Sequence, residues 1–162
     1  MSALGMSQKR SAACSAPAAS HPAGDYTHSL VVRRIRETMN SAYRTLPAIA
    51  RRAPFNPAFL HPDDLESLGL ASGDRVEIIS PHGAIPAVVE ADEAVRPGVV
   101  SMTHGYGGLP GDDEDPAQGA STCRLVSAAQ YLEPINAMAR MTGVPVRLKA
   151  TGSLATRVDL DP

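Results

Sequence analysis

HPDDLESLGLASGDRVEIISPHGAI, residues 61–85, is the stretch of sequence that does most to decide the fold. Pro62 stands at a first helical position, where its missing N–H costs nothing. Two aspartates follow in the first turn, where the helix dipole favours negative charge. Gly69 is placed to end the helix in a left-handed conformation. A short helix is therefore predicted at about residues 62–68.

Short extended segments follow this helix. Polar and apolar residues alternate over 75–79, and a Pro-His-Gly turn sends the chain back through a second strand at 84–90. Pro86 lacks an N–H for a sheet ladder and favours an edge position or a bulge in that strand. The same criteria predict further strands at 29–35, 99–103 and 144–149, with a long loop at 104–121.

The composition agrees with a mainly β domain. The 162 residues include 13 Gly and 14 Pro, and turn signals recur between short strands, which favours a β-barrel with small helical insertions over a helical bundle. No apolar run approaches the roughly 20 residues of a membrane-spanning helix. We expect a disordered tail at 1–25, a barrel at 26–150 and a C-terminal tail at 151–162.

Charge is distributed unevenly along the chain. Residues 1–54 carry eight Lys and Arg against two acids, whereas residues 55–162 carry seven against fifteen. A basic first third suits a phosphate-bearing partner. The alternatives are that the two parts attract each other or that the arginines are simply solvated.

Cysteine and histidine give no metal motif. Cys14 and Cys123 form no CxxC pair, and the five histidines show no ligand spacing, so no metal site is expected. Reduced thiols, and the lack of an apolar secretory segment after Lys9 and Arg10, favour a cytoplasmic protein.

Two segments carry candidate binding residues. A basic run leaves the first strand and enters a loop, and a Gly-rich loop follows the strand at 99–103. Guanidinium groups bind phosphate, amides and hydroxyls bind heterocycle edges, and glycines allow close backbone approach. A protected edge strand and an ordinary surface loop are the alternatives. No catalytic nucleophile is evident. The residues are Arg33, Arg34, Arg36, Asn40 and Ser41 in the first segment, and His104, Gly105 and Tyr106 in the second.

Three stretches in order resemble one family. They are residues 61–85, VRPGVVSMTHGYG at 95–107, and STCRLVSAAQYLEPINAMARMTGVPVRL at 121–148. Together they resemble the C-terminal dinucleotide-binding domain of the bis-pterin molybdenum and tungsten oxidoreductases. The resemblance implies a six-stranded double-psi β-barrel of the aspartate-decarboxylase-like fold. It also implies a bound molybdopterin guanine dinucleotide, whose metal is held by a partner domain.

The resemblance also assigns residues to the cofactor. By position they are Arg36, Asn40 and Ser41 after the first strand, His104, Gly105 and Tyr106 after the Pro-Gly-Val-Val strand, and Cys123 with Arg124 in the closing segment; Arg33 joins them from the basic run. Cys123 stands where the family often has Asn, and Glu133-Pro134 replaces the family's Asp-Pro. Without the resemblance, Cys123 could be a reactive thiol, but a free cysteine inside ordered β structure is more often a small apolar filler.

The family's iron–sulfur and metal ligands lie in domains that this sequence lacks. The leading hypothesis is therefore a cofactor-covering domain or subunit, catalytically incomplete alone, that works with a separately encoded catalytic molybdoenzyme chain. A truncated remnant barrel without activity is one alternative. A small β-barrel interaction or nucleic-acid-binding module is another, which the acidic remainder of the chain and the scarcity of aromatic residues oppose.

Overall fold

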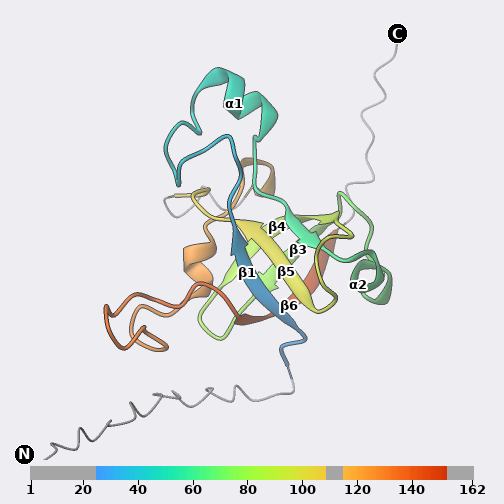
Figure 1. The fold of residues 1–162 in the computed structure, drawn as a ribbon. Helices are drawn as coiled ribbons and strands as arrows, with labels where there is room; N and C mark the ends of the chain where they lie inside the picture. Colours follow the sequence, from blue (N-terminus) through green and yellow to red (C-terminus); the bar gives the residue numbers. More distant parts are fainter. Residues whose placement is uncertain (1–24, 109–114, 153–162) are drawn as a thin grey trace, which may run out of the picture.

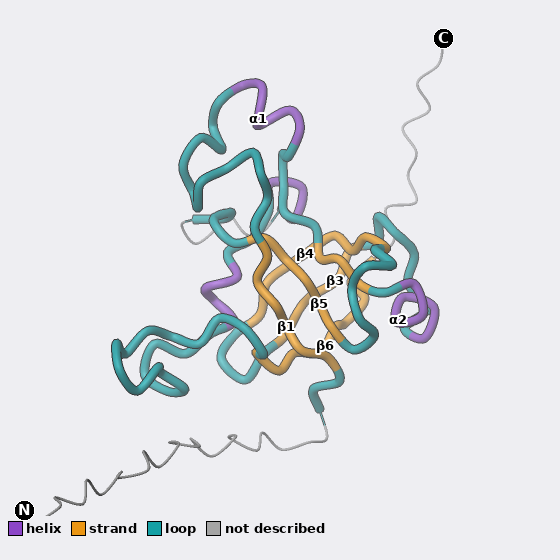
Figure 2. Tube along the Cα trace, in the orientation of Figure 1, coloured by secondary structure: helices purple, strands orange, loops and turns teal. Residues whose placement is uncertain are grey.

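Six strands form a closed barrel in the computed structural model, which describes residues 25–108 and 115–152 (Figures 1 and 2). The strands are β1 (His28–Arg33), β2 (Ala58–Leu60), β3 (Arg75–Ile79), β4 (Ala84–Ala91), β5 (Val99–Thr103) and β6 (Val144–Gly152). The helices are α1 (Pro47–Arg52), α2 (Pro62–Ser67) and the 3-10 turns η1 (Pro116–Gln118) and η2 (Thr122–Leu125). The expected mainly β, six-stranded barrel with short helices is confirmed. The expected tails, apart from Asp25 and residues 151–152, and most of the acidic loop tip lie outside the described residues.

Strand direction places the functional segments at one end of the barrel. Around the barrel the order is β1-β5-β2-β4-β3-β6, with β1 parallel to β5, β2 parallel to β4, and the other pairs antiparallel. Strands β1, β3 and β5 therefore end where β2, β4 and β6 begin. We call this end the rim. The connections that leave it are residues 34–57, 80–83 and 104–143.

The core fills the barrel interior with aliphatic side chains. Alternation is clear in β3, which buries Val76 and Ile78 but leaves the residues between and beside them partly exposed or exposed. Each large aliphatic side chain so buried contributes roughly 1.5–3 kcal/mol to stability. The fully buried large members are Leu30, Leu60, Ile78, Ile85, Met102, Leu125, Val76, Val89, Val100 and Val146.

Strand β4 explains the position of Pro86. Residues 84–88 of β4 pair with β3, whereas β2 pairs only with residues 89–91. Pro86 therefore lies opposite Glu77, and no strand of the described ranges pairs with it on the other side, which confirms the expected edge position. Turns η1 and η2 lie against β4 instead.

Local signals predicted some elements better than others. The helix at 62–68 appears as α2, with the His61 ring accepting a hydrogen bond from the Asp63 amide at 3.2 Å and with Gly69 at φ +65°. Helix α1, which begins at Pro47, was not predicted. Strand β2 was not predicted, and β6 continues three residues beyond the expected strand, to Gly152.

Candidate functional site

The connection between β1 and β2 is an extended basic arm, residues 34–57. It projects from the rim at the top of Figure 1 and carries α1. Its first turn is a two-residue reversal in which the Ala42 amide donates to the Met39 carbonyl at 3.0 Å. Asn40 occupies the left-handed region at φ 56°, a conformation that asparagine tolerates better than most residues. The turn fixes Asn40 and Ser41 at the exposed edge of the arm.

Asn40 contacts the loop that follows β5. The Nε2 atom of His104 lies 3.2 Å from Oδ1 of Asn40. Because an amide oxygen only accepts, Nε2 donates in this contact. In a neutral imidazole the other nitrogen is then an acceptor, and Nδ1 of His104 is buried without a partner among the described residues. The arm and the β5 loop are thus joined by a side-chain hydrogen bond that leaves one buried acceptor open.

Gly105 brings the two backbones into contact. Its φ is +84°, and a Cβ atom at this position would lie 2.8 Å from the carbonyl oxygen of Asn40 and 3.2 Å from the nitrogen of Ser41. Real Cβ atoms are not found at the first of these distances without a shift of the neighbouring chain. Glycine is therefore required for the close approach of the two loops.

Tyr106 ties the β5 loop to the base of the arm. Its ring is buried, and its hydroxyl donates to the carbonyl of Ala53 at 3.0 Å. The guanidinium carbon of Arg44 lies 5.2 Å from the ring centre, within cation–π range. Burial raises the pKa of the Tyr106 phenol, so it stays a neutral donor. The ring lines a cavity of about 310 Å³ between the arm and the barrel.

A buried asparagine that sequence reasoning missed organises the same loop. The Asn56 amide nitrogen donates to the carbonyls of Thr103 and Ala120, at 2.6 and 2.9 Å, and its oxygen accepts from the Ala120 amide at 2.9 Å. Gly119 packs so closely on Asn56 and Tyr106 that a Cβ there would have no room. The only sequence signal at Asn56 was that a proline, Pro57, follows it. An Asn-Pro dipeptide predicts a turn and does not predict a buried side chain that hydrogen-bonds two distant segments.

Arg33 points to the side of the barrel instead of into this cluster. Its guanidinium donates to the Asp92 carboxylate at 3.0 Å and lies 4.4 Å from the centre of the Phe59 ring. The Ala94 amide and then the Arg33 side chain hold the pKa of Asp92 below its usual value through hydrogen bonds. The two partners of Arg33 are structural, and no described contact links it to Asn40 or His104.

The remaining predicted residues lie on the arm and on η2. Arg36 and Ser41 are exposed on the arm. Cys123 is exposed on η2 rather than buried as an apolar filler. Arg124, beside it, is half-buried, and its carbonyl oxygen would be 2.5 Å from a Cβ at Gly83, which fixes η2 against the β3–β4 turn. No described contact joins η2 directly to Asn40 or His104.

The arm concentrates positive charge at the rim. It carries five arginines, with Glu37 as its single acid. Within the described part of the chain, none of the five forms an ion pair with a carboxylate. Unpaired guanidinium groups on an exposed arm suit an anionic ligand. The five are Arg34, Arg36, Arg44, Arg51 and Arg52.

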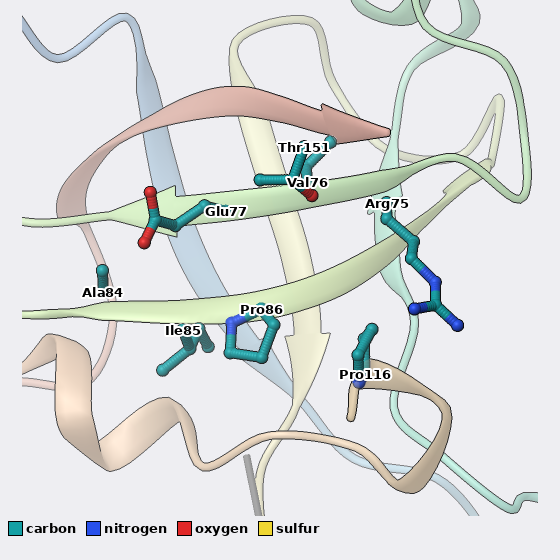
Figure 3. Close-up of a pocket in the computed structure, with 8 residues that line it drawn as sticks. All are labelled: Arg75, Val76, Glu77, Ala84, Ile85, Pro86, Pro116 and Thr151. Carbon is teal, nitrogen blue, oxygen red and sulfur yellow. The ribbon is translucent and has the colours of Figure 1, made fainter. Parts of the chain in front are cut away.

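A larger pocket of about 510 Å³ lies elsewhere, along the open edge of β4 (Figure 3). Arg75 extends toward Pro116 there, and Glu77 lies at the other end, so its polar groups do not converge. No predicted site residue lines it. In the ranges that the structure describes, no three His, Cys, Asp or Glu side chains are placed to hold a metal ion, and no helix is long and apolar enough to cross a membrane.

Comparison with known proteins assigns the family. Residues 29–145 match the model of the molydopterin dinucleotide binding domain. The chain belongs to the molybdopterin dinucleotide-binding domain family. The match covers every strand from β1 to the start of β6, and it confirms the resemblance on which the site residues were predicted.

Relatives of this domain are much longer proteins. Over 70 residues, or 43% of this chain, the sequence is 41% identical to a tetrathionate reductase subunit of Salmonella typhimurium, covering 7% of that protein. The structure superimposes on acetylene hydratase from Pelobacter acetylenicus with a TM-score of 0.67 and 22% identity, over 77% of this chain and 18% of the hydratase. The chain thus spans a small fraction of the length of these two proteins.

The residues at the rim fit the cofactor that the family implies, a molybdopterin dinucleotide. Such a molecule presents a pyrophosphate and two heterocycles with amino and carbonyl edges. The arm has guanidinium groups without carboxylate partners that would suit the pyrophosphate, and Asn40 and Ser41 have polar groups that would suit the heterocycle edges. The glycine at 105 keeps both loops close enough to act on one ligand.

Proposed function

We propose that this chain covers a molybdopterin guanine dinucleotide in a molybdenum or tungsten oxidoreductase whose metal-ligating and electron-transfer domains are supplied by a separate catalytic chain. The observation that carries the proposal is the Asn40–His104 contact, which joins the basic arm to the β5 loop at one end of the barrel. The family match supports the cofactor class. The guanine moiety and the double-psi crossing of the connections belong to the same proposal and rest on the sequence resemblance. A cytoplasmic location also belongs to it and rests on the cysteine usage and the N-terminal sequence.

Each rim residue has a role set by its chemistry. Arg36, exposed and without an ion-pair partner among the described residues, would bind a phosphate oxygen through its guanidinium N–H groups. Asn40 and Ser41 would hydrogen-bond a heterocycle edge, and Gly105 permits the approach. Cys123 and Arg124 on η2 would contact the cofactor from the third segment. Arg33, engaged by Asp92, would act by holding the end of β1 in place.

His104 would supply the complement to an N–H group of the ligand once its buried Nδ1 atom is uncovered. Its Nε2 atom is engaged with Asn40, and its Nδ1 atom is an open acceptor. A pterin and a guanine both carry amino groups that donate to such an acceptor, whereas a phosphate does not. A buried acceptor without a partner costs about 1–3 kcal/mol, and ligand binding recovers part of that cost. When bound, the cofactor supplies the metal at which oxidation or reduction takes place.

The test is the cofactor content of the complex that the chain forms in its own cells. The tagged full chain is purified from them, and pterin, guanine nucleotide, molybdenum and tungsten are measured per mole of chain. We expect a co-purifying catalytic chain, one metal equivalent and pterin together. A chain that emerges alone and free of pterin would overturn the proposal and favour the remnant barrel.

A matched pair of variants links that content to the rim. Arg36→Ala removes an exposed arginine on the arm, and Arg96→Ala removes an exposed arginine at the opposite end of the barrel. Only the first is expected to lower the pterin content of the purified complex. Equal loss in both variants would mean that the rim does not bind the cofactor.

A further inference from the structure

The buried Asn56 side chain pairs with backbone groups in the way that a neighbouring strand does. The residue is 2% exposed. Its amide nitrogen donates to the Ala120 carbonyl at 2.9 Å, and its oxygen accepts from the Ala120 amide at 2.9 Å. The second N–H of the same nitrogen donates to the Thr103 carbonyl at 2.6 Å. A carboxylate only accepts and a hydroxyl donates once, so this arrangement requires a side-chain amide.

These hydrogen bonds join three segments at the rim. Asn56 lies near the end of the arm, and Thr103 is the last residue of β5, directly before His104. Ala120 belongs to residues 119–125, which we call the η2 segment because it contains η2. The Asn40–His104 contact joins only the arm and the β5 loop. Asn56 therefore adds the η2 segment to them, so that one side chain links all three segments for which cofactor-binding residues are predicted.

The packing of Gly119 shows that the η2 segment rests on Asn56. Its φ is +82°, and a Cβ at this position would lie 2.5 Å from Oδ1 of Asn56 and 2.8 Å from Cδ1 of Tyr106. The Tyr106 hydroxyl in turn donates to the Ala53 carbonyl on the arm. The position of the η2 segment is thus set by two buried side chains, one from the arm and one from the β5 loop.

Both segments that Asn56 holds carry a buried polar atom without a partner among the described residues. Nδ1 of His104 belongs to the residue after Thr103, and Oγ1 of Thr122 lies two residues after Ala120. Buried polar atoms without a partner are rare in folded proteins because they cost free energy, and a ligand or an ordered water that pairs with them removes this cost. A fully paired amide between two incompletely paired segments is typical of a support for a binding site.

We infer that Asn56 is a positioning residue of the cofactor site, which fixes the η2 segment relative to the end of β5 so that both contact the same dinucleotide. The inference rests on the proposed function, because that function supplies the ligand. Asn56 is buried and both of its N–H groups are engaged, so it does not itself contact the cofactor. It acts through the segments that carry His104 and Cys123.

The first test compares Asn56→Asp with a core variant that lowers stability elsewhere. Asn56→Asp keeps the size of the side chain but turns a carboxylate toward two carbonyl oxygens, which drives the segments apart. Leu65→Ala opens a cavity at α2, at the opposite end of the barrel. The full chain is titrated with molybdopterin guanine dinucleotide at a temperature where both variants are folded. We expect affinity to fall at least about tenfold in Asn56→Asp and less than about twofold in Leu65→Ala.

A second variant moves the η2 segment and leaves Asn56 unchanged, so the test does not depend on the folding of Asn56→Asp. Gly119→Ala places a methyl group against Asn56 and Tyr106. Gly73→Ala, its control, adds a methyl group at a similar positive φ with no atom within 4 Å. We expect Gly119→Ala to bind the dinucleotide at least about tenfold more weakly than Gly73→Ala does.

Amide hydrogen exchange at saturating dinucleotide separates positioning from a general stabilising role. In the wild type we expect slower exchange on binding in both residues 104–108 and residues 119–125. In Asn56→Asp and Gly119→Ala we expect slower exchange in 104–108 alone, because the η2 segment no longer reaches the same ligand. Protection of both segments in the saturated variants would overturn the positioning role.

The outcomes distinguish this inference from the proposed function. If the wild-type chain binds the dinucleotide and Asn56→Asp binds it equally well, or loses no more affinity than Leu65→Ala, the positioning role is overturned and the cofactor role stands. If the chain binds the dinucleotide only within its complex, pterin per mole of chain in complexes purified from its own cells replaces affinity, and we expect the same order of variants. A wild-type chain that neither binds the dinucleotide nor brings down pterin overturns both.

Discussion

The Nε2 atom of His104 lies 3.2 Å from Oδ1 of Asn40, a residue 64 positions earlier in the chain. The two meet because β1 and β5 are parallel neighbours whose last residues, Arg33 and Thr103, are paired. The segments that leave these two strands therefore start side by side. This single relationship turns two separate polar segments into one candidate binding surface.

Arginine 36 gives the first prediction. Arg36→Ala is expected to weaken binding of the dinucleotide to the full chain by about 1.5–3 kcal/mol, the usual range for hydrogen bonds to charged groups. Because the side chain is exposed, the free energy of unfolding is expected to change little. Calorimetric titration with the isolated dinucleotide measures the effect, with Arg96→Ala as the control. Affinity equal to that of the wild type would remove Arg36 from the site.

Asparagine 56 gives a stability prediction. Asn56→Ala leaves the Thr103 carbonyl and both polar groups of Ala120 without their buried partners. Each buried polar group left without a hydrogen-bond partner costs about 1–3 kcal/mol. We therefore expect the free energy of unfolding to fall by at least about 2 kcal/mol. Urea unfolding provides the measurement. Asn136→Ala, at an exposed asparagine, is the control. An equal effect in both variants would contradict the stabilising role of the buried Asn56 hydrogen bonds.

Glycine 105 gives a prediction with an internal control. Gly105 and Gly73 both have positive φ, at +84° and +96°, but only Gly105 has a backbone oxygen in the space that a Cβ would fill. Gly73→Ala therefore carries only the conformational cost of a left-handed alanine. Gly105→Ala carries that cost and the crowding against Asn40, so it should cost at least about 1 kcal/mol more, within the range known for strained backbone positions.

Dinucleotide affinity distinguishes crowding at the site from a general loss of stability. Gly105→Ala is expected to weaken binding because it separates the arm from the β5 loop, whereas Gly73→Ala leaves binding unchanged. Unfolding curves and titrations of both variants provide the data. If the two alanine variants match in both measurements, the loops do not need to approach each other.

Histidine 28 makes stability depend on pH. Burial lowers the pKa of the His28 imidazole below its ordinary 6.5, and this effect outweighs the opposing attraction of Asp64, whose carboxylate oxygen lies 3.9 Å from Nε2. The unfolded chain therefore binds this proton more readily than the folded one. It follows that His28 lowers stability progressively as the pH falls below about 6.5, and the loss is complete below the folded-state pKa.

Thermal unfolding between pH 7.5 and pH 5 measures this dependence. His28→Gln cannot take up the proton, so its midpoint is expected to fall less over this range than that of the wild type. The Asp92 carboxyl, whose pKa is also lowered, titrates in a more acidic window and does not interfere. Identical pH profiles for the two chains would show that His28 is not linked to folding.

Sequence reasoning located the elements that have strong local signals. Helix α2 was predicted from Pro62 and Gly69, and β3 from its alternation, because these cues act within a few residues. Helix α1 was missed because it has no side-chain cap and buries no residue, so neither capping nor periodicity marks it. Strand β2 has three residues, too few for alternation to be visible.

Only part of the site could be predicted, and the reason differs from the one that hid helix α1 and strand β2. The polar types at 40–41 and 104–106 were visible in the sequence, and the family resemblance grouped them. That Tyr106 is buried, that Arg33 turns to Asp92 and that Asn56 holds the loop all depend on which strands are neighbours in the barrel. Such pairings are long-range, and a local pattern does not contain them.

Amide hydrogen exchange of the full chain, with and without saturating molybdopterin guanine dinucleotide, tests the central claim most directly. The account predicts slower exchange on binding in residues 34–57 and 104–108, and no change at the opposite end of the barrel in residues 61–74 and 92–98. Protection confined to the opposite end, or no protection anywhere at saturating ligand, would contradict it.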